Sequence, residues 1–375
     1  MPRVPSSAKK KLAVVAALLL GVAALAWWQR GPLLGWYILR GLASAGEQDR
    51  AAWAERVAGL DAEAVPGLVA LLRRDDPRVC ANAEAALAAL AKRWGRDDAR
   101  TAALAEQLAS SFGGLATPGR EAVLEWYLGL LHDLDAASAT AAPLTATADK
   151  LLVSASRLPD KGVRVRALIL AEVVLARLPP RQTGLYRDLA LQGLSAPEAE
   201  VRAGAARLAM HPPLCADEPL LEKVVPLLKD PSPEVRRAAL LTIGLAEKTI
   251  GVDELVPLLQ DGDAEVRRLC ERALRGRGLL DSHIQVAKLI SDRRPGERLQ
   301  VVHHLRDADD LTAGVLLRLS QDAAPAVRAA AVRFAAEDPA AADFEERLMQ
   351  MAREDASPTV RQLAAHYLKT LQRRN

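Results

Sequence analysis

Few residues in this sequence have the type and spacing that catalysis or metal binding requires. The six histidines are scattered, and His303-His304 is the only adjacent pair. Neighbouring side chains on a helix point about 100° apart, so the two rings are poorly placed to share a metal ion. The three cysteines, Cys80, Cys215 and Cys270, are far apart and form no CxxC pair. They indicate no disulfide framework, and Cys80 and Cys270 fit helical apolar patterns as small buried residues.

The sequence also lacks the motifs that carry most enzyme chemistry. It contains no P-loop, no GxGxxG after a strand, no HExxH, no GxSxG and no EF-hand loop. Each of these motifs places specific groups around a phosphate, a metal ion or a nucleophile. We therefore expect a non-enzymatic protein without a cofactor.

Cationic side chains are the remaining candidates for a site. An arginine guanidinium binds a carboxylate through paired, charge-assisted hydrogen bonds, so an arginine cluster suits an acidic segment of a partner protein. Such a cluster lies in residues 267–277. The candidate partner-binding residues are Arg237, Arg268, Arg272, Arg275, His303 and His304, with Arg333 expected on the same face. An ordinary solvated helix face, which is the commoner case, accounts for the same residues.

A phrase that recurs along the chain indicates which elements hold these residues. In each clear copy an Asp precedes a Val-Arg pair by five residues. The copies are Asp230 with Val235-Arg236, Asp261 with Val266-Arg267, Asp322 with Val327-Arg328, and Asp355 with Val360-Arg361. A fixed offset of this kind is typical of internal repeats, which build a shared core by stacking.

The residues around one copy predict a helix, a turn and a second helix. Residues 218–229 are apolar at helical spacing, Asp-Pro-Ser-Pro at 230–233 ends that helix, and residues 234–246 resume the pattern. Pro226 and Pro257 fall inside the first helices of two repeats. Because proline interrupts the hydrogen-bond ladder of a helix, we expect each of them to kink its helix.

The spacing of all copies predicts the extent of the array. With looser copies included, the anchor positions are 49, 79, 119, 165, 201, 235, 266, 297, 327 and 360. From 165 onward the intervals are 30 to 36 residues, the length of one helix pair. Half of the residues are hydrophobic but only 3% are aromatic, which suits short packed helices better than strands. We predict an all-α solenoid of stacked antiparallel helix pairs over 36–375, with up to ten units, most regular from 160 to 375.

The phrase and its prolines resemble HEAT repeats, in particular the bacterial HEAT-like class related to phycobilin lyases. The resemblance implies a superhelix whose second helices line a concave face, where the candidate residues would lie. It also implies that the four Val-Arg arginines bond the repeat Asp residues in a ladder between successive turns, rather than a ligand. HEAT repeats host many functions, so a bilin-lyase-like enzyme or enzyme accessory protein is the alternative to a scaffold.

An uncharged segment near the N-terminus predicts a membrane anchor. Residues 1–11 are polar and basic, and residues 12–28 hold no charged side chain. As a helix this run spans about 25 Å, near the lower limit for crossing the hydrocarbon core of a bilayer. Trp27 and Trp28 suit the membrane interface at its end. We predict a transmembrane signal anchor over 12–29.

A cleaved signal peptide is the alternative interpretation of the same segment. Ala24-Leu25-Ala26 is a small-x-small site, and cleavage there would remove residues 1–26. Both interpretations send the chain into the export pathway. Four basic residues precede the segment and two follow it closely. For an anchor, this bias places the N-terminus in the cytoplasm and the repeat domain outside it, in the periplasm.

The charge balance argues against nucleic acid as a partner. Residues 1–46 hold six basic and no acidic residues, which leaves 44 basic against 47 acidic residues in the rest, a net charge of −3. Phosphate binding without sequence preference requires a positive field. The sequence therefore predicts a single-pass, membrane-tethered scaffold that binds one or more proteins through its concave surface, with no small-molecule substrate.

Overall fold

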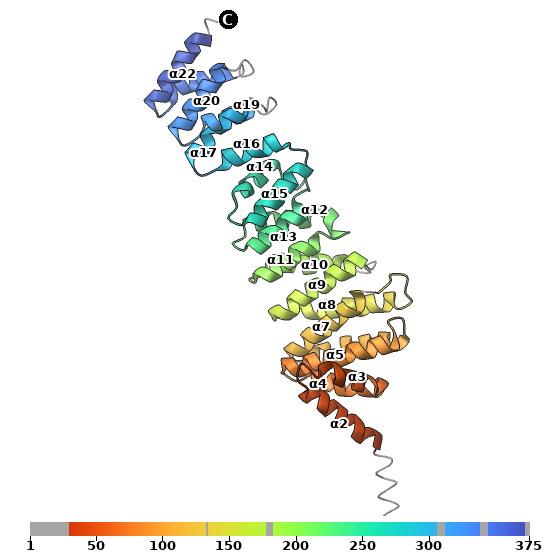
Figure 1. Ribbon diagram of the computed structural model, residues 1–375. Helices are drawn as coiled ribbons and strands as arrows, with labels where there is room; N and C mark the ends of the chain where they lie inside the picture. The colour runs from red at the N-terminus through yellow and green to blue at the C-terminus, as the bar shows by residue number, and fades with distance from the viewer. Residues whose placement is uncertain (1–29, 133, 178–182, 306–311, 338–343, 372–375) are drawn as a thin grey trace, which may run out of the picture. The chain divides into compact units, whose positions relative to one another are not determined.

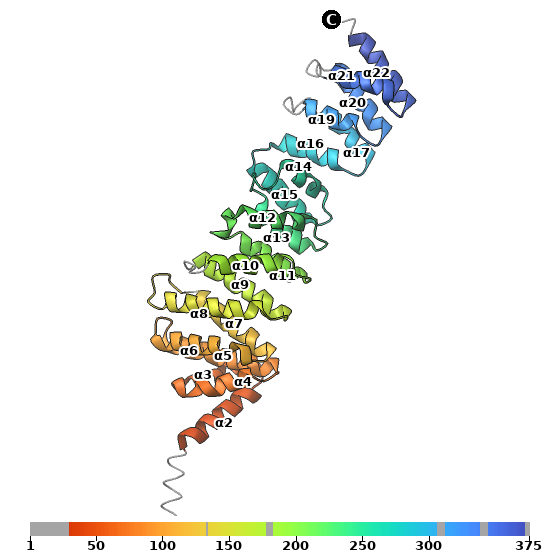
Figure 2. The same cartoon turned by 180° about the vertical axis from the view of Figure 1, so that it is seen from behind.

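The structure of the protein is a computed structural model that describes residues 30–132, 134–177, 183–305, 312–337 and 344–371. Every secondary-structure element in these ranges is a helix, so the predicted all-α fold is confirmed. The chain divides into two compact units, Met1–Leu214 (unit 1) and Cys215–Asn375 (unit 2). Each unit is an α-solenoid of stacked short helices (Figures 1 and 2).

Unit 1 is a stack of helix pairs in chain order. Its described pairs are α2 (Arg30–Ser44) with α3 (Arg50–Ala58), α4 (Val65–Leu72) with α5 (Pro77–Trp94), α6 (Ala99–Ser111) with α7 (Thr117–His132), α8 (Ala141–Ser156) with α9 (Lys161–Arg177), and α10 (Thr183–Leu194) with α11 (Ala199–Ala209). The short 3-10 helix η1 (Asp61–Ala64) lies between α3 and α4, and η2 (Phe112–Gly114) lies between α6 and α7. Successive first helices contact one another, and so do successive second helices. The core therefore runs through the whole stack, because each pair is covered by its neighbours.

Unit 2 follows the same scheme with shorter helices. Its described pairs are α12 (Glu218–Val224) and η4 (Val225–Lys229) with α13 (Pro233–Ile243), α14 (Val252–Leu255) and η5 (Val256–Gln260) with α15 (Ala264–Gly276), α16 (Asp281–Ser291) with α17 (Pro295–Leu299) and α18 (Val301–His304), α19 (Thr312–Ser320) with α20 (Pro325–Glu337), and α21 (Glu345–Glu354) with α22 (Pro358–Leu371). The 3-10 helix η3 (Leu214–Ala216) precedes α12. The second helices of this unit carry most of the candidate residues.

The prolines interrupt the first helices at the predicted places. α12 ends at Val224, and the chain continues as the 3-10 helix η4, whose second residue is Pro226. α14 changes to η5 in the same way at Pro257. A proline ring clashes with the carbonyl group four residues earlier and has no N–H to donate to it. The tighter 3-10 turn relieves this clash while the leucines that follow stay in the core.

Most apolar anchors of the repeat phrase lie in the core, on second helices. The predicted anchor Val165 is only half-buried, and the buried valine of α9 is Val163, two residues earlier. The anchor valines with at most 1% exposure are Val201, Val235, Val266, Val327 and Val360. In α7 the anchor position holds Gly119, and a Cβ atom there would lie 1.9 Å from the backbone oxygen of Leu72. This copy of the phrase has glycine instead of valine because α7 approaches the backbone at the end of α4 closely. Only glycine, which has no Cβ atom, permits this approach.

The predicted anchor over 12–29 and the cleavage site of the alternative interpretation lie outside the described residues. Within the described ranges, no helix combines the length and the apolar character needed to cross a membrane. The first described helix, α2, begins at Arg30, directly after the predicted anchor.

Candidate functional site

The arginine of the repeat phrase joins two successive loops of unit 2. The Nε and Nη2 atoms of Arg236 donate to the two carboxylate oxygens of Asp261 in the next repeat, at 2.8 and 2.7 Å. Its Nη1 atom donates to the backbone oxygen of Asp230 in its own loop, at 2.7 Å. The Asp261 carboxylate also accepts the backbone N–H of Asp263, at 2.9 Å. One guanidinium therefore fixes its own turn and the turn that follows.

The same arrangement recurs further along unit 2. Arg298 pairs with Asp322 at 2.6 and 2.8 Å, and Arg328 pairs with both oxygens of Asp355 at 2.8 Å. In the three pairs the side chains are only 5 to 15% exposed. The hydrogen bond from Arg328 lowers the pKa of Asp355 below its ordinary value of 3.8. Two arginines of the predicted ladder, Arg236 and Arg328, thus pair with the aspartate of the next repeat, and Arg298 of a looser copy does the same.

Two arginines of the predicted ladder pair with no carboxylate among the described residues. Arg361 donates to the backbone oxygens of Asp355 and Ala356, and Arg267 leaves a gap between two repeats. Arg267 donates to the backbone oxygens of Asp261 and Gly262 but pairs with no carboxylate. The expected partner, Asp292, accepts instead from Arg294 in its own loop, at 3.2 and 3.1 Å. The two carboxylate oxygens of Asp292 are thus paired with a guanidinium of their own loop and not with Arg267 of the preceding repeat.

The structure places four predicted partner-binding arginines on α13 and α15. Arg237 pairs with Asp263 of the next repeat at 3.1 and 3.0 Å, and the same carboxylate caps α15. The other engaged arginines are Arg268, which pairs with Glu265, and Arg275, which pairs with Asp281 and Glu271. Arg272 is exposed and has no ion pair within the described chain, although it contributes, after Arg268, to a lowered pKa of Glu265. Arg272 is therefore the candidate with most freedom to meet a partner.

The predicted histidines lie at the end of α18. His303 is exposed and His304 is half-buried. Over the described ranges, no three His, Cys, Asp or Glu residues are grouped so that they could hold a metal ion.

Arg272 and His303 occupy equivalent positions in their repeats, and other repeats have further residues at the same position. The residue five places after each arginine of the phrase is exposed on a second helix of unit 2. We call this set the outer row: Leu241, Arg272, His303, Arg333 and His366. Arg333, like Arg272, makes no ion pair with any described residue. Leu241 and His366 were not predicted, although the constant offset from the phrase could have identified both.

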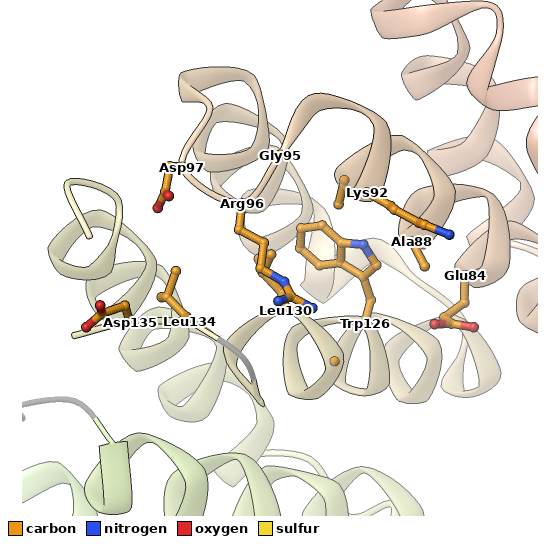
Figure 3. Close-up of a pocket in the computed structure, with 12 residues that line it drawn as sticks. Glu84, Ala88, Lys92, Gly95, Arg96, Asp97, Trp126, Leu130, Leu134 and Asp135 are labelled. Atoms are coloured by element: carbon orange, nitrogen blue, oxygen red, sulfur yellow. The ribbon is translucent and has the colours of Figure 1, made fainter. Parts of the chain in front are cut away.

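Unit 1 carries a separate groove of about 680 Å³ between α5 and α7 (Figure 3). The buried indole of Trp126 faces Lys92 and Ala88 on α5, with Arg96 beside it. Burial and the charge of Glu125 raise the pKa of Glu84 at one end of the groove, while Arg50 opposes the shift. An apolar floor with charged groups at its rim is suited to hold a side chain of a binding partner.

Comparison with known proteins identifies the repeats. A model of HEAT repeats matches residues 187–275 and 221–306. Residues 187–306 are HEAT repeats. The ladder and the outer row of α13, α15 and α18 therefore belong to a HEAT array. None of the curated proteins compared with this chain matches it.

Solved structures similar to this chain include an X-ray structure of YibA from Escherichia coli. That chain is 17% identical, the match covers 87% of this chain and 98% of YibA, and the TM-score is 0.39. Two crystal structures of engineered proteins are also similar. One is 18% identical over 90% of this chain and 99% of its own, with a TM-score of 0.30. The other is 21% identical over 64% and 94%, with a TM-score of 0.27.

Proposed function

We propose that this HEAT-repeat chain is a non-enzymatic scaffold, tethered to the membrane by residues 12–29, with its repeats in the periplasm. In this proposal the outer row of unit 2 binds an extended acidic segment of a partner protein. The observation that supports it is the row itself, in which cationic and imidazole side chains are exposed at the same position of successive second helices.

The charge of the row favours an acidic partner. The ladder and the pairs of Arg237 and Arg275 already satisfy most nearby carboxylates. Arg272 and Arg333 make no such pair with the described residues, so they keep their capacity to bind carboxylates of another protein. Exposed Leu241, 49% accessible, adds an apolar contact at one end of the row.

The distance between successive repeats sets the spacing of the carboxylates along the partner segment. Packed helices lie about 8 to 10 Å apart. An extended chain advances about 3.3 Å per residue. A partner that follows the row would therefore present a carboxylate at about every third residue, one for each repeat.

A peptide titration tests this function. A peptide with glutamate at every third position is titrated into the full chain in detergent, and its affinity is compared with that of a peptide of the same composition with clustered glutamates. We expect the spaced peptide to bind more tightly, and the double variant Arg272→Glu, Arg333→Glu to bind it about tenfold more weakly or worse.

The matched control is Lys248→Glu, Arg353→Glu, which changes the net charge equally at exposed positions of unit 2 outside the row. We expect its affinity for the spaced peptide to stay close to that of the original chain. Equal losses in the two double variants, or equal affinity for the two peptides, would show an ordinary solvated surface and refute the proposal.

A further inference from the structure

The first described helix of unit 1, α2, exposes an unusual amount of apolar surface. Leu34, Trp36 and Tyr37 on α2 are 54, 59 and 62% accessible, and they lie within four residues. The opposite face of α2 is packed, since Leu42 is fully buried and Leu39 contacts α4 at Gly67. Large exposed rings so close together are costly in water, which indicates a surface with an apolar partner.

A groove of about 580 Å³ adjoins these rings, between α2, α4 and the start of α5. Three of its lining residues are the exposed arginines Arg40, Arg74 and Arg78. The guanidinium of Arg40 lies over the ring of Trp36, 5.2 Å from its centre. The groove thus combines an aromatic edge with three cations.

The carboxylates around the groove do not neutralise these cations. Asp76, the acidic residue that lines it, caps α5 by accepting the backbone N–H groups of Arg78 and Val79 at 2.9 and 3.2 Å. Within the described part of the chain, none of the three arginines forms an ion pair. Residues 1–46 contain no Asp or Glu, so the preceding segment supplies no carboxylate either. Guanidinium groups without an ion pair are suited to bind phosphate oxygens.

The position of the α2 surface along the sequence indicates which partner covers it. α2 begins at Arg30, directly after the apolar run that ends at Trp28. Exposed aromatic rings next to such a run prefer the interface of a bilayer, and arginines there bind the phosphates of anionic lipids.

We propose that unit 1 docks on an anionic bilayer surface through α2. Trp36 and Tyr37 enter the interface, and Arg40, Arg74 and Arg78 bind lipid phosphate groups. The inference rests on the membrane tether of the proposed function and adds a lipid-binding face to it. It orients unit 1 against the membrane, where the tether alone would leave it unconstrained.

Site-specific labelling of the full chain in vesicles tests the proposal. In a Cys215→Ser background, whose remaining cysteines Cys80 and Cys270 are buried, an environment-sensitive fluorophore is attached at Tyr37→Cys. The matched control is Leu280→Cys in unit 2, which is 61% accessible against 62% for Tyr37. Vesicles contain either phosphatidylcholine alone or equal parts of phosphatidylcholine and phosphatidylglycerol, with or without brominated chains.

In the anionic vesicles we expect blue-shifted emission at position 37 and quenching by the brominated lipid, with neither effect at position 280. Arg74→Gln with Arg78→Gln should reduce the quenching at position 37 at least twofold at low salt, while the chain still sediments with the vesicles. An aqueous spectrum at position 37 would overturn the proposal. So would a blue shift without lipid quenching, which would indicate a protein occupant, or a signal that ignores lipid charge and the arginine variants.

The two proposals fail separately. A chain that does not sediment with vesicles lacks the tether, and a chain in detergent that ignores the spaced acidic peptide lacks the scaffold function. A chain that sediments but keeps position 37 in water lacks only the lipid-binding face.

Discussion

At the scale of single residues, the arginine of the repeat phrase is a structural residue. Its planar group with several donors reaches a carboxylate of the next repeat and a carbonyl of its own loop at once, as Arg236 shows. The cysteines are also structural where they are buried. Burial raises the pKa of Cys270 to about 12, so its thiol stays protonated and donates to the backbone oxygen of Leu255 at 3.2 Å.

The gap in the ladder provides a matched pair of variants. Arg236→Gln removes two hydrogen bonds to the nearly buried carboxylate of Asp261, whereas Arg267→Gln removes only bonds to carbonyl oxygens. Both arginines also donate to two backbone oxygens of their own loops, so the variants differ by the bonds to Asp261. Hydrogen bonds that involve charged groups contribute about 1.5 to 3 kcal/mol each. We expect the free energy of unfolding in urea to fall by about 2 kcal/mol more for Arg236→Gln. Equal losses would contradict the structural role of the ladder.

At the scale of helices, each element has one face in the core and one in solvent. On α13, Ile243 is fully buried while Leu241, two residues earlier, is 49% accessible. Small buried residues one turn earlier, Ala238 and Ala239, let the neighbouring helices approach closely. The face that a leucine or isoleucine occupies, rather than its type, therefore decides its contribution to stability.

Alanine substitutions on α13 measure this difference. Ile243→Ala leaves a cavity in the shared core and should lower the free energy of unfolding by about 2 to 5 kcal/mol. Leu241→Ala removes a side chain that faces solvent and should change it by less than about 0.5 kcal/mol. Chemical unfolding followed by circular dichroism compares the two variants. A large loss for Leu241→Ala would mean that this face of α13 is packed, contrary to its exposure.

At the scale of the whole molecule, stability is distributed over neighbouring repeats. The free energy of unfolding depends on pH through the aspartates of the ladder. The hydrogen bond from Arg328 lowers the pKa of Asp355. Burial raises the pKa of Asp261 and Asp322, but the bonds from Arg236 and Arg298 outweigh it, so both values also lie below 3.8. A lowered folded pKa gives stabilisation that is present above the unfolded pKa and is lost as the pH falls through the folded value.

Acid should therefore weaken unit 2. We expect the thermal midpoint of the chain to change little between about pH 7 and 5 and to fall once the pH drops below about 4. Arg328→Gln should reduce the size of this fall, because Asp355 then loses the partner that lowers its pKa. Thermal unfolding at several pH values tests both statements. A midpoint in the variant that falls as steeply as in the original chain would argue against the contribution of this pair.

The sequence by itself determined the helical repeat, the inward valines of unit 2, and the breaks at Pro226 and Pro257. These features depend on hydrophobic period, proline geometry and a recurring phrase, which are local and are repeated along the chain. Residues 12–29 carry a prediction that the described residues do not test.

Only the tertiary structure decided which cations are available to a partner. Arg237 is engaged because stacking brings Asp263 of the next repeat to it, and Arg267 lacks a carboxylate because Asp292 turns to Arg294. The groove beside α2 likewise exists only where residues 36–44 pack against residues 67–79. Pairings between repeats depend on how side chains meet across stacked helices, and this geometry has no counterpart in the spacing of one repeat.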